Sequence, residues 1–208
     1  VAFAFAGLHT LDKITGDYFH PFFGSVIQIH VGFLSHGLTR RILTNPAIED
    51  FPLGYTSAAE DKIYELTHGQ PYLVQLIGFH LVRLYNDFVF EKGKTRTNMF
   101  DVEDVEKVVN RREFFTRGSN YFNGVWRQAG EHGNTQKLIL ISLAKSPQGL
   151  SLNELVELTE IDIDYLLENL EILKAHDVIA ENEGKWIIII ELFRRWVEIK
   201  NHTLRSNN

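Results

Sequence analysis

Apolar residues in the first part of the chain are concentrated in two short runs, a continuous one at residues 1–6 and an interrupted one at residues 25–31. Runs of this length predict buried strands, and the loop between them contains Gly16, Pro21 and Gly24. A two-stranded sheet is marginal in water. We therefore expect these strands to be the last part of a larger α/β sheet.

Longer segments with helical spacing of apolar residues follow. They predict helices at residues 36–44, 58–66, 71–86, 102–109 and 115–128. Ser35 and Ser57 are the expected N-caps of the first two, and Glu60 would complete a capping box with Ser57. The helix that begins at Pro71 is apolar on several sides, so we expect it at the centre of a small helical domain.

A short polar connection at residues 130–134 predicts a domain boundary. Beyond it the pattern is helix, helix, helix, hairpin, helix, which is the order of a winged helix with one extra helix at the end. These elements are expected at residues 136–145, 152–158, 162–176, 178–181 paired with 185–190, and 191–200. The predicted fold class is therefore mainly α with small β.

One helix is predicted to stop and the next to start within the segment Thr67-His68-Gly69-Gln70-Pro71. Glycine just after a helix and proline in the first turn of the next are what backbone chemistry favours in any case. The motif is thus open to two interpretations: a plain helix corner, or a nucleotide-contacting corner of the Gly-x-Pro form found in some ATPases.

Composition narrows the function classes. The chain has 208 residues, of which 44% are hydrophobic and 23% charged, enough for one large or two small cores. It has no cysteine, which excludes disulfides, thiolate zinc sites and cysteine nucleophiles and fits the cytoplasmic location that we expect. Apolar runs such as 186–190 are too short to span a bilayer, so no membrane contact is expected. The net charge of −6 disfavours overall attraction to nucleic acid, although a local basic patch could still act.

Taken in order, these pieces resemble the C-terminal part of an AAA+ ATPase of the signal-transducing (STAND) type. The resemblance covers essentially the whole chain and is strongest at Phe33-Leu34-Ser35, at residues 66–76 and at residues 191–196. It implies a remnant of the α/β ATPase core at 1–33, a helical lid domain at 34–130, and a winged-helix domain with a C-terminal helix at 131–208.

The resemblance also implies roles for individual residues. His9 and Thr10 would follow the sensor-1 strand and lie near the terminal phosphate and the attacking water, where an imidazole or a hydroxyl can orient either one. Both could equally satisfy backbone groups at a strand end. Gly69, Gln70 and Pro71 would form the lid corner near adenine.

The phosphate-binding half of such a site is missing from the sequence. Gly93-Lys94-Thr95 is not a P-loop, because Phe88 stands where the first glycine is needed and no strand precedes it. No acidic pair follows an apolar strand either. ATP or ADP with Mg²⁺ would therefore be bound by a complete protein that includes an N-terminal P-loop core. We expect this chain alone to bind no nucleotide tightly, to lack catalytic activity, and to act within that protein as part of a nucleotide-dependent switch.

Two alternatives remain: a non-enzymatic winged-helix protein that binds nucleic acid, and a protein-interaction module. Residues 162–176 carry Asp162, Asp164, Glu168 and Glu171 against Lys174 alone, which disfavours DNA and favours a protein partner.

Arg111, Arg112 and Arg117 lie among aromatic residues and could bind nucleic acid. Phe115, Phe122 and Trp126 recur at spacings of seven and four, however, which predicts a buried helical face with the arginines outside. The histidines show no metal-ligand spacing, so no metal site is expected.

Overall fold

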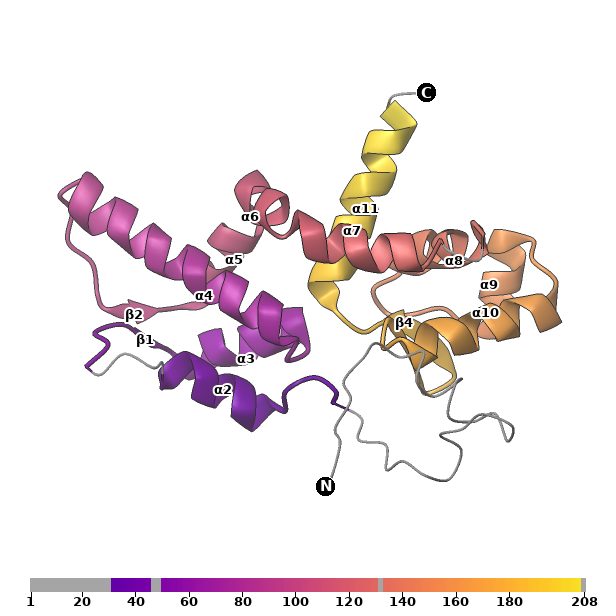
Figure 1. The fold of residues 1–208 in the computed structure, drawn as a ribbon, viewed down its shortest axis with the longest axis horizontal. Coiled ribbons are helices and arrows are strands. Elements are labelled where there is room, and N and C mark those ends of the chain that lie inside the picture. Colours follow the sequence, from indigo (N-terminus) through magenta and orange to yellow (C-terminus); the bar gives the residue numbers. More distant parts are fainter. Residues whose placement is uncertain (1–30, 46–49, 131–132, 207–208) are drawn as a thin grey trace, which may run out of the picture. The chain divides into compact units, whose positions relative to one another are not determined.

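Helices account for most of the computed structural model, which describes residues 31–45, 50–130 and 133–206 (Figure 1). The mainly α prediction with small β content is confirmed for this part of the chain. All described elements belong to the compact unit Phe33–Asn208. The strand predicted at 1–6, all but the last residue of the one at 25–31, and the candidates His9 and Thr10 lie outside the described residues.

The first helices surround α4, as the sequence predicts. The elements are α2 (His36–Thr44), β1 (Gly54–Tyr55), α3 (Ser57–Thr67), α4 (Pro71–Asn86), a π-helical turn (Asp87–Glu91), β2 (Met99–Phe100), α5 (Val102–Val109), α6 (Arg112–Arg117) and α7 (Ser119–Gln128). In α4, one broad face is buried, including Leu73, Ile77 and Leu81, whereas Tyr72 and Phe79 are exposed. β1 and β2 form a short parallel pair that the sequence did not predict.

The N-cap of α2 is predicted correctly and that of α3 is not. The Ser35 hydroxyl accepts a hydrogen bond from the Leu38 amide. α3 is capped by Thr56 instead of Ser57, which is its first helical residue. Glu60 therefore completes no capping box. Its carboxylate is buried and lies 2.6 Å from the Arg40 guanidinium, so a tertiary ion pair decides its position.

The single helix predicted at 115–128 is also wrong, because the chain breaks at Gly118 into α6 and α7. A Cβ at Gly118 would lie 2.8 Å from the Phe122 ring and 3.1 Å from Leu76. A larger residue than glycine would therefore not fit at position 118 without a shift of its neighbours. Because of the break, Phe115 and Phe122 lie on different helices, although their rings still meet at 5.6 Å between centroids.

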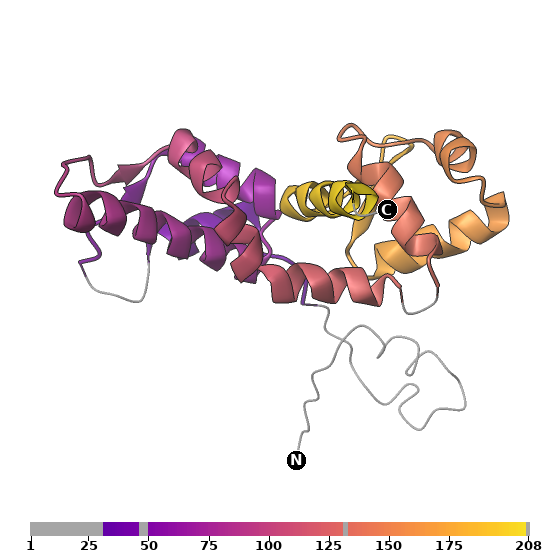
Figure 2. The ribbon, with the colours of Figure 1, turned by 90° about the horizontal axis from the view of Figure 1, so that it is seen from above.

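The remaining elements follow the predicted order. They are α8 (Thr135–Ala144), α9 (Leu152–Thr159), α10 (Ile163–Ala175), the antiparallel hairpin of β3 (Ile179–Asn182) and β4 (Lys185–Ile188), and α11 (Glu191–Ser206). Ser151 caps α9 in a capping box with Glu154. α11 runs beyond the predicted end at residue 200. It packs on both α8 and α3, and Figure 2 shows it in yellow between the helices on either side.

Aromatic rings hold the first turns of α11. The Trp196 ring stacks on Phe122 of α7 at 5.8 Å between centroids and on Phe193 at 5.9 Å. The edge of Trp126 meets Trp196 at 6.1 Å. Stacked and edge-on ring pairs of this kind stabilise beyond the area that they bury.

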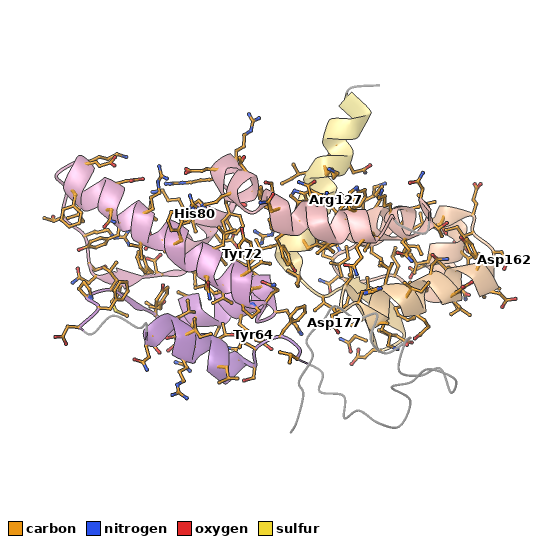
Figure 3. All side chains as sticks on the ribbon, viewed as in Figure 1. Tyr64, Tyr72, His80, Arg127, Asp162 and Asp177 are labelled. Atoms are coloured by element: carbon orange, nitrogen blue, oxygen red, sulfur yellow. The ribbon has the colours of Figure 1, made fainter. Side chains whose placement is uncertain are left out.

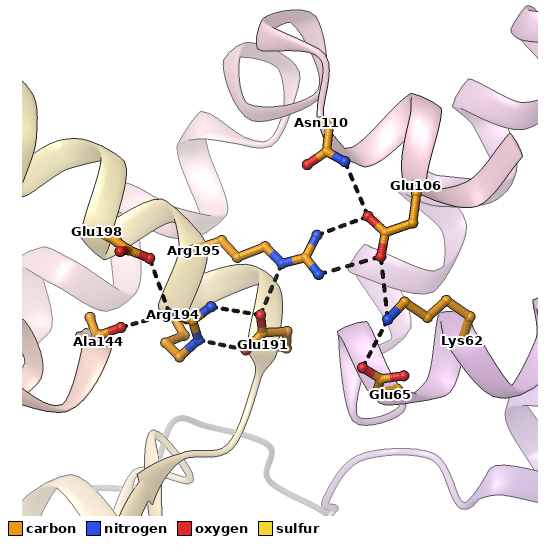
Figure 4. A network of polar contacts seen from close by, with 9 residues as sticks. All are labelled: Lys62, Glu65, Glu106, Asn110, Ala144, Glu191, Arg194, Arg195 and Glu198. Atoms are coloured by element: carbon orange, nitrogen blue, oxygen red, sulfur yellow. Dashed lines mark hydrogen bonds and ion pairs between the residues drawn. The ribbon is translucent and has the colours of Figure 1, made fainter. Parts of the chain in front are cut away.

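Charged side chains join α11 to α3 and α5 (Figure 4). The Arg195 guanidinium lies 3.1 Å from the Glu106 carboxylate and donates a 2.9 Å hydrogen bond to Glu191. Lys62 of α3 lies 3.3 Å from the same Glu106 carboxylate. Burial opposes the ionisation of Glu106, but the hydrogen bonds from Arg195 and Lys62 outweigh it and lower its pKa. The pKa of Glu191 is lowered in the same way, against burial, by Arg194 and Arg195.

These pKa shifts predict an acid-dependent loss of stability. A carboxylate whose pKa is lowered by folding contributes stability that is complete above about pH 5 and is lost as the pH falls through the lowered pKa. Glu106→Gln should therefore reduce the steepness with which the free energy of unfolding falls between about pH 7 and pH 3. Urea unfolding across this range measures it.

The matched control is Glu168→Gln, because Glu168 is exposed and has no ion pair within the described part of the chain. Its pH dependence should follow that of the wild type. Identical slopes for the Glu106 variant and the wild type would show that the network contributes nothing to stability.

Candidate functional site

The corner between α3 and α4 has the geometry that the sequence predicts. α3 ends at Thr67, and the backbone then turns through His68 and Gly69, with φ of 49° and 73°. Gln70 caps α4, its side-chain carbonyl accepting a 2.8 Å hydrogen bond from the Leu73 amide, and Pro71 is the first helical residue. Tyr64 on α3 and Tyr72 on α4 lie on the two sides of the corner (Figure 3).

The segment Phe33-Leu34-Ser35 packs directly against this corner. The Leu34 amide donates a 2.9 Å hydrogen bond to the Gly69 carbonyl, and a Cβ on Gly69 would lie 2.0 Å from the Leu34 carbonyl oxygen. The buried Thr67 hydroxyl donates to the Ile63 carbonyl and accepts from the Gly69 amide. Two of the sequence segments that carry the resemblance are therefore in direct contact, and only glycine fits at position 69.

A group of rings that the sequence reasoning missed lies beside the corner. Tyr64 stacks on His68 at 5.7 Å, His36 meets Tyr64 edge-on at 4.8 Å, and Phe33 meets His68 edge-on at 6.2 Å. The His36 imidazole also lies 2.9 Å from the Asp61 carboxylate. The only local signal was the spacing of Tyr64 and His68, one turn apart on the same helix. Partly exposed rings of this kind can stack against a planar base.

Backbone amides at the start of α4 are mostly used within the chain. Pro71 has no N–H, the Leu73 amide bonds the Gln70 side chain, and the Val74 amide bonds the Gln70 carbonyl. Among the described residues, no acceptor is found for the Tyr72 amide. Of the amides at the start of α4, only that of Tyr72 is thus without an acceptor among the described residues. A single donor suits the polar edge of a base better than a chain of phosphates.

One of the predicted basic residues, Arg117, contacts a neighbouring ring, and an ion pair lies close by. The Arg117 guanidinium lies 3.9 Å from the centre of the Phe79 ring, and Arg83 lies 3.1 Å from the Glu113 carboxylate. Phe122 is fully buried, whereas Phe115 and Trp126 are only partly buried. Arg117 of α6 is thus held against α4, and Arg83 of α4 is held against α6.

The predicted acidic helix begins at Asp162 (Figure 3), whose side chain caps α10. Asp164, Glu168 and Glu171 are exposed, as the charge argument requires.

Other site classes receive no support from the described part of the chain. Within it, no group of three or more histidine, aspartate or glutamate side chains is arranged to hold a metal ion. None of its helices has the length and apolar character needed to cross a membrane. Comparisons of the chain with protein-family models, curated proteins and solved structures return no match.

The contact between Gly69 and Leu34 generates a stability prediction. Gly69→Ala should lower the free energy of unfolding by about 3 kcal/mol or more, since overpacking adds to the cost of the left-handed backbone. Gly93 is the matched control, because it also has a positive φ, of 61°, but nothing within 4 Å of the Cβ position. Gly93→Ala should cost only about 1 kcal/mol. Urea unfolding of both variants measures the difference, and equal losses would show that Leu34 does not constrain the corner.

Proposed function

We propose that this chain is the lid and winged-helix portion of an AAA+/STAND-type ATPase, which acts as a nucleotide-dependent molecular switch. In this proposal residues 1–33 end the α/β core, 34–130 form the lid and 131–208 form the winged-helix domain. The observation that carries the proposal is the corner at Gly69, Gln70 and Pro71, held against Leu34 at the entry to the lid.

The residues at the corner fit the base of a nucleotide. Tyr64 and His68 supply ring surface, and the Tyr72 amide supplies a polar contact. Because Leu34 bonds the corner directly, a base bound there would press on the segment that joins the lid to the preceding core. This arrangement would convert the presence of a nucleotide into a change of lid position.

The phosphates need groups from elsewhere. The sequence has no Gly-x-x-x-x-Gly-Lys-Ser/Thr segment, and at the corner only the Tyr72 amide lacks an acceptor among the described residues. ATP or ADP with Mg²⁺ would therefore be held in the complete protein by a P-loop core, where Mg²⁺ would neutralise phosphate charge. This chain would recognise the base and change its lid position when the nucleotide binds.

The network on α11 supports a switch in which the lid and the C-terminal module move together. Arg195 bonds Glu106 on α5, and Trp196 stacks on Phe122 of α7. Because these contacts are direct, a motion of α3 and α5 would move α11 as well. The order of elements α8 to α11, with Leu150 bridging Trp186 beside the hairpin, supports the winged-helix assignment.

A substitution at Pro71 tests the proposal in the complete protein. At the first helical position proline mainly restricts the unfolded chain, so Pro71→Ala should lower the free energy of unfolding by only about 0.4 to 1 kcal/mol. If Pro71 packs on adenine, the dissociation constant for ADP should rise about tenfold, equivalent to about 1.4 kcal/mol. ADP titration with parallel melting measures both quantities.

Pro147→Ala is the control, because Pro147 is exposed in the turn after α8, remote in sequence from the corner. It should leave ADP affinity unchanged. Equal ADP affinities for wild type and Pro71→Ala would reduce the corner to a helix turn.

A further inference from the structure

Helices α9 and α10 present a surface on which exposed apolar and acidic side chains alternate. We call it the acidic–apolar face and define it by Leu158, Ile163 and Leu167 together with Glu157, Glu160, Asp164, Glu168 and Glu171. It includes the outer side of α10, where a DNA-binding winged helix would meet DNA.

The apolar members are all exposed. Leu158 is 60% exposed, Ile163 43% and Leu167 37%. Ile163 and Leu167 are one turn apart on α10 and so share a side, while Leu158 stands at the end of α9 just before the connecting turn. A single exposed leucine needs no explanation, but apolar side chains gathered around one turn mark an interaction site.

The acidic members form a stripe beside them. Asp164, Glu168 and Glu171 are spaced by four and three residues, so they follow one side of α10. Glu171 lies 3.7 Å from Lys174, and within the described part of the chain neither Asp164 nor Glu168 has an ion-pair partner. Like charges at this spacing destabilise a helix by a few tenths of a kcal/mol. Cations from outside would relieve that repulsion.

The face is rigid before any partner arrives. The opposite side of α10 is fixed in the core by the fully buried Leu166 and Leu170. The Asp162 side chain caps the helix, accepting from the Asp164 and Tyr165 amides. Binding would therefore cost little ordering of the helix itself.

We propose that the acidic–apolar face binds a basic amphipathic segment of a partner protein. Apolar side chains of the partner would cover Leu158, Ile163 and Leu167, and its lysines or arginines would meet the acidic stripe. Charge complementarity selects this occupant. DNA and anionic lipid surfaces would be repelled by the stripe, and a second copy of this chain would bring the same carboxylates to the contact. The proposal uses only described residues and does not depend on the nucleotide site.

The test uses the full chain and a defined probe. The probe is a fluorescein-labelled helical peptide of about 18 leucine and lysine residues with one apolar side. Fluorescence anisotropy at about 150 mM salt should show saturable binding that weakens as salt rises, because the charged contacts are exposed. A labelled DNA duplex should bind more weakly than the peptide.

Variants separate the specific face from overall charge. Glu168→Lys with Glu171→Lys should weaken peptide binding at least about tenfold, since attraction becomes repulsion. Leu167→Ser should weaken peptide binding about fivefold, because it removes apolar contact area. If Leu167→Ser lowers the melting temperature, Leu158→Ser replaces it, because Leu158 is more exposed. The control, Glu91→Lys with Glu103→Lys, makes the same change in net charge at exposed positions outside α9 and α10 and should alter binding less than about twofold.

Several results would overturn the proposal. Absence of saturable peptide binding would do so, as would equal losses in the charge-reversed variant and its control. Tighter binding of duplex DNA than of the peptide would assign the face to nucleic acid. A dimer detected by sedimentation and abolished by Leu167→Ser would assign it to a second copy of the chain.

Discussion

The attachment of α11 through adjacent arginines is the interaction on which the rest of residues 33–208 depends. Arg194 donates a 2.6 Å hydrogen bond to the Ala144 carbonyl at the end of α8, where a cation also meets the negative end of the helix dipole. Arg195 reaches Glu106 on α5. Neighbouring residues of one helix thus hold both sides of the unit, and Trp196 fills the apolar space beside them. Without α11, helices α5 and α8 would lose these polar links.

Local signals predicted much of this fold, and tertiary contacts decided the rest. Ser35, Ser151 and Pro71 mark helix starts where the chemistry of the first turn leaves little choice. At α3 two neighbouring hydroxyl residues could cap, and the pairing of Glu60 with Arg40 is invisible to local reasoning. The tight packing around Gly118 involves Leu76 of α4, far away in sequence, and the β1–β2 pair is too short to leave a periodic pattern.

In the candidate site, too, some features could be predicted from local sequence and others arise only from tertiary contacts. Gly69, Gln70 and Pro71 could be identified from the sequence, because glycine and proline report backbone conformation directly. The contact with Leu34 and the rings around Tyr64 could not, since they arise only when α2 and the segment before it pack on α3. In the proposed switch, α11, which packs on α3 and α8, would link the nucleotide corner to the acidic–apolar face. A switch requires that the two respond together.

That mechanical link is the central claim, and a double-mutant cycle tests it most directly. Glu106→Gln and Arg195→Gln are made singly and together, and their free energies of unfolding are measured in urea. Glu106→Gln with Arg83→Gln forms the control cycle, because Arg83 pairs with Glu113 and not with Glu106. The account predicts a coupling free energy of about 1 kcal/mol or more between Glu106 and Arg195, and additivity in the control. A coupling below about 0.3 kcal/mol, the value expected of an exposed pair that contributes little, would contradict it.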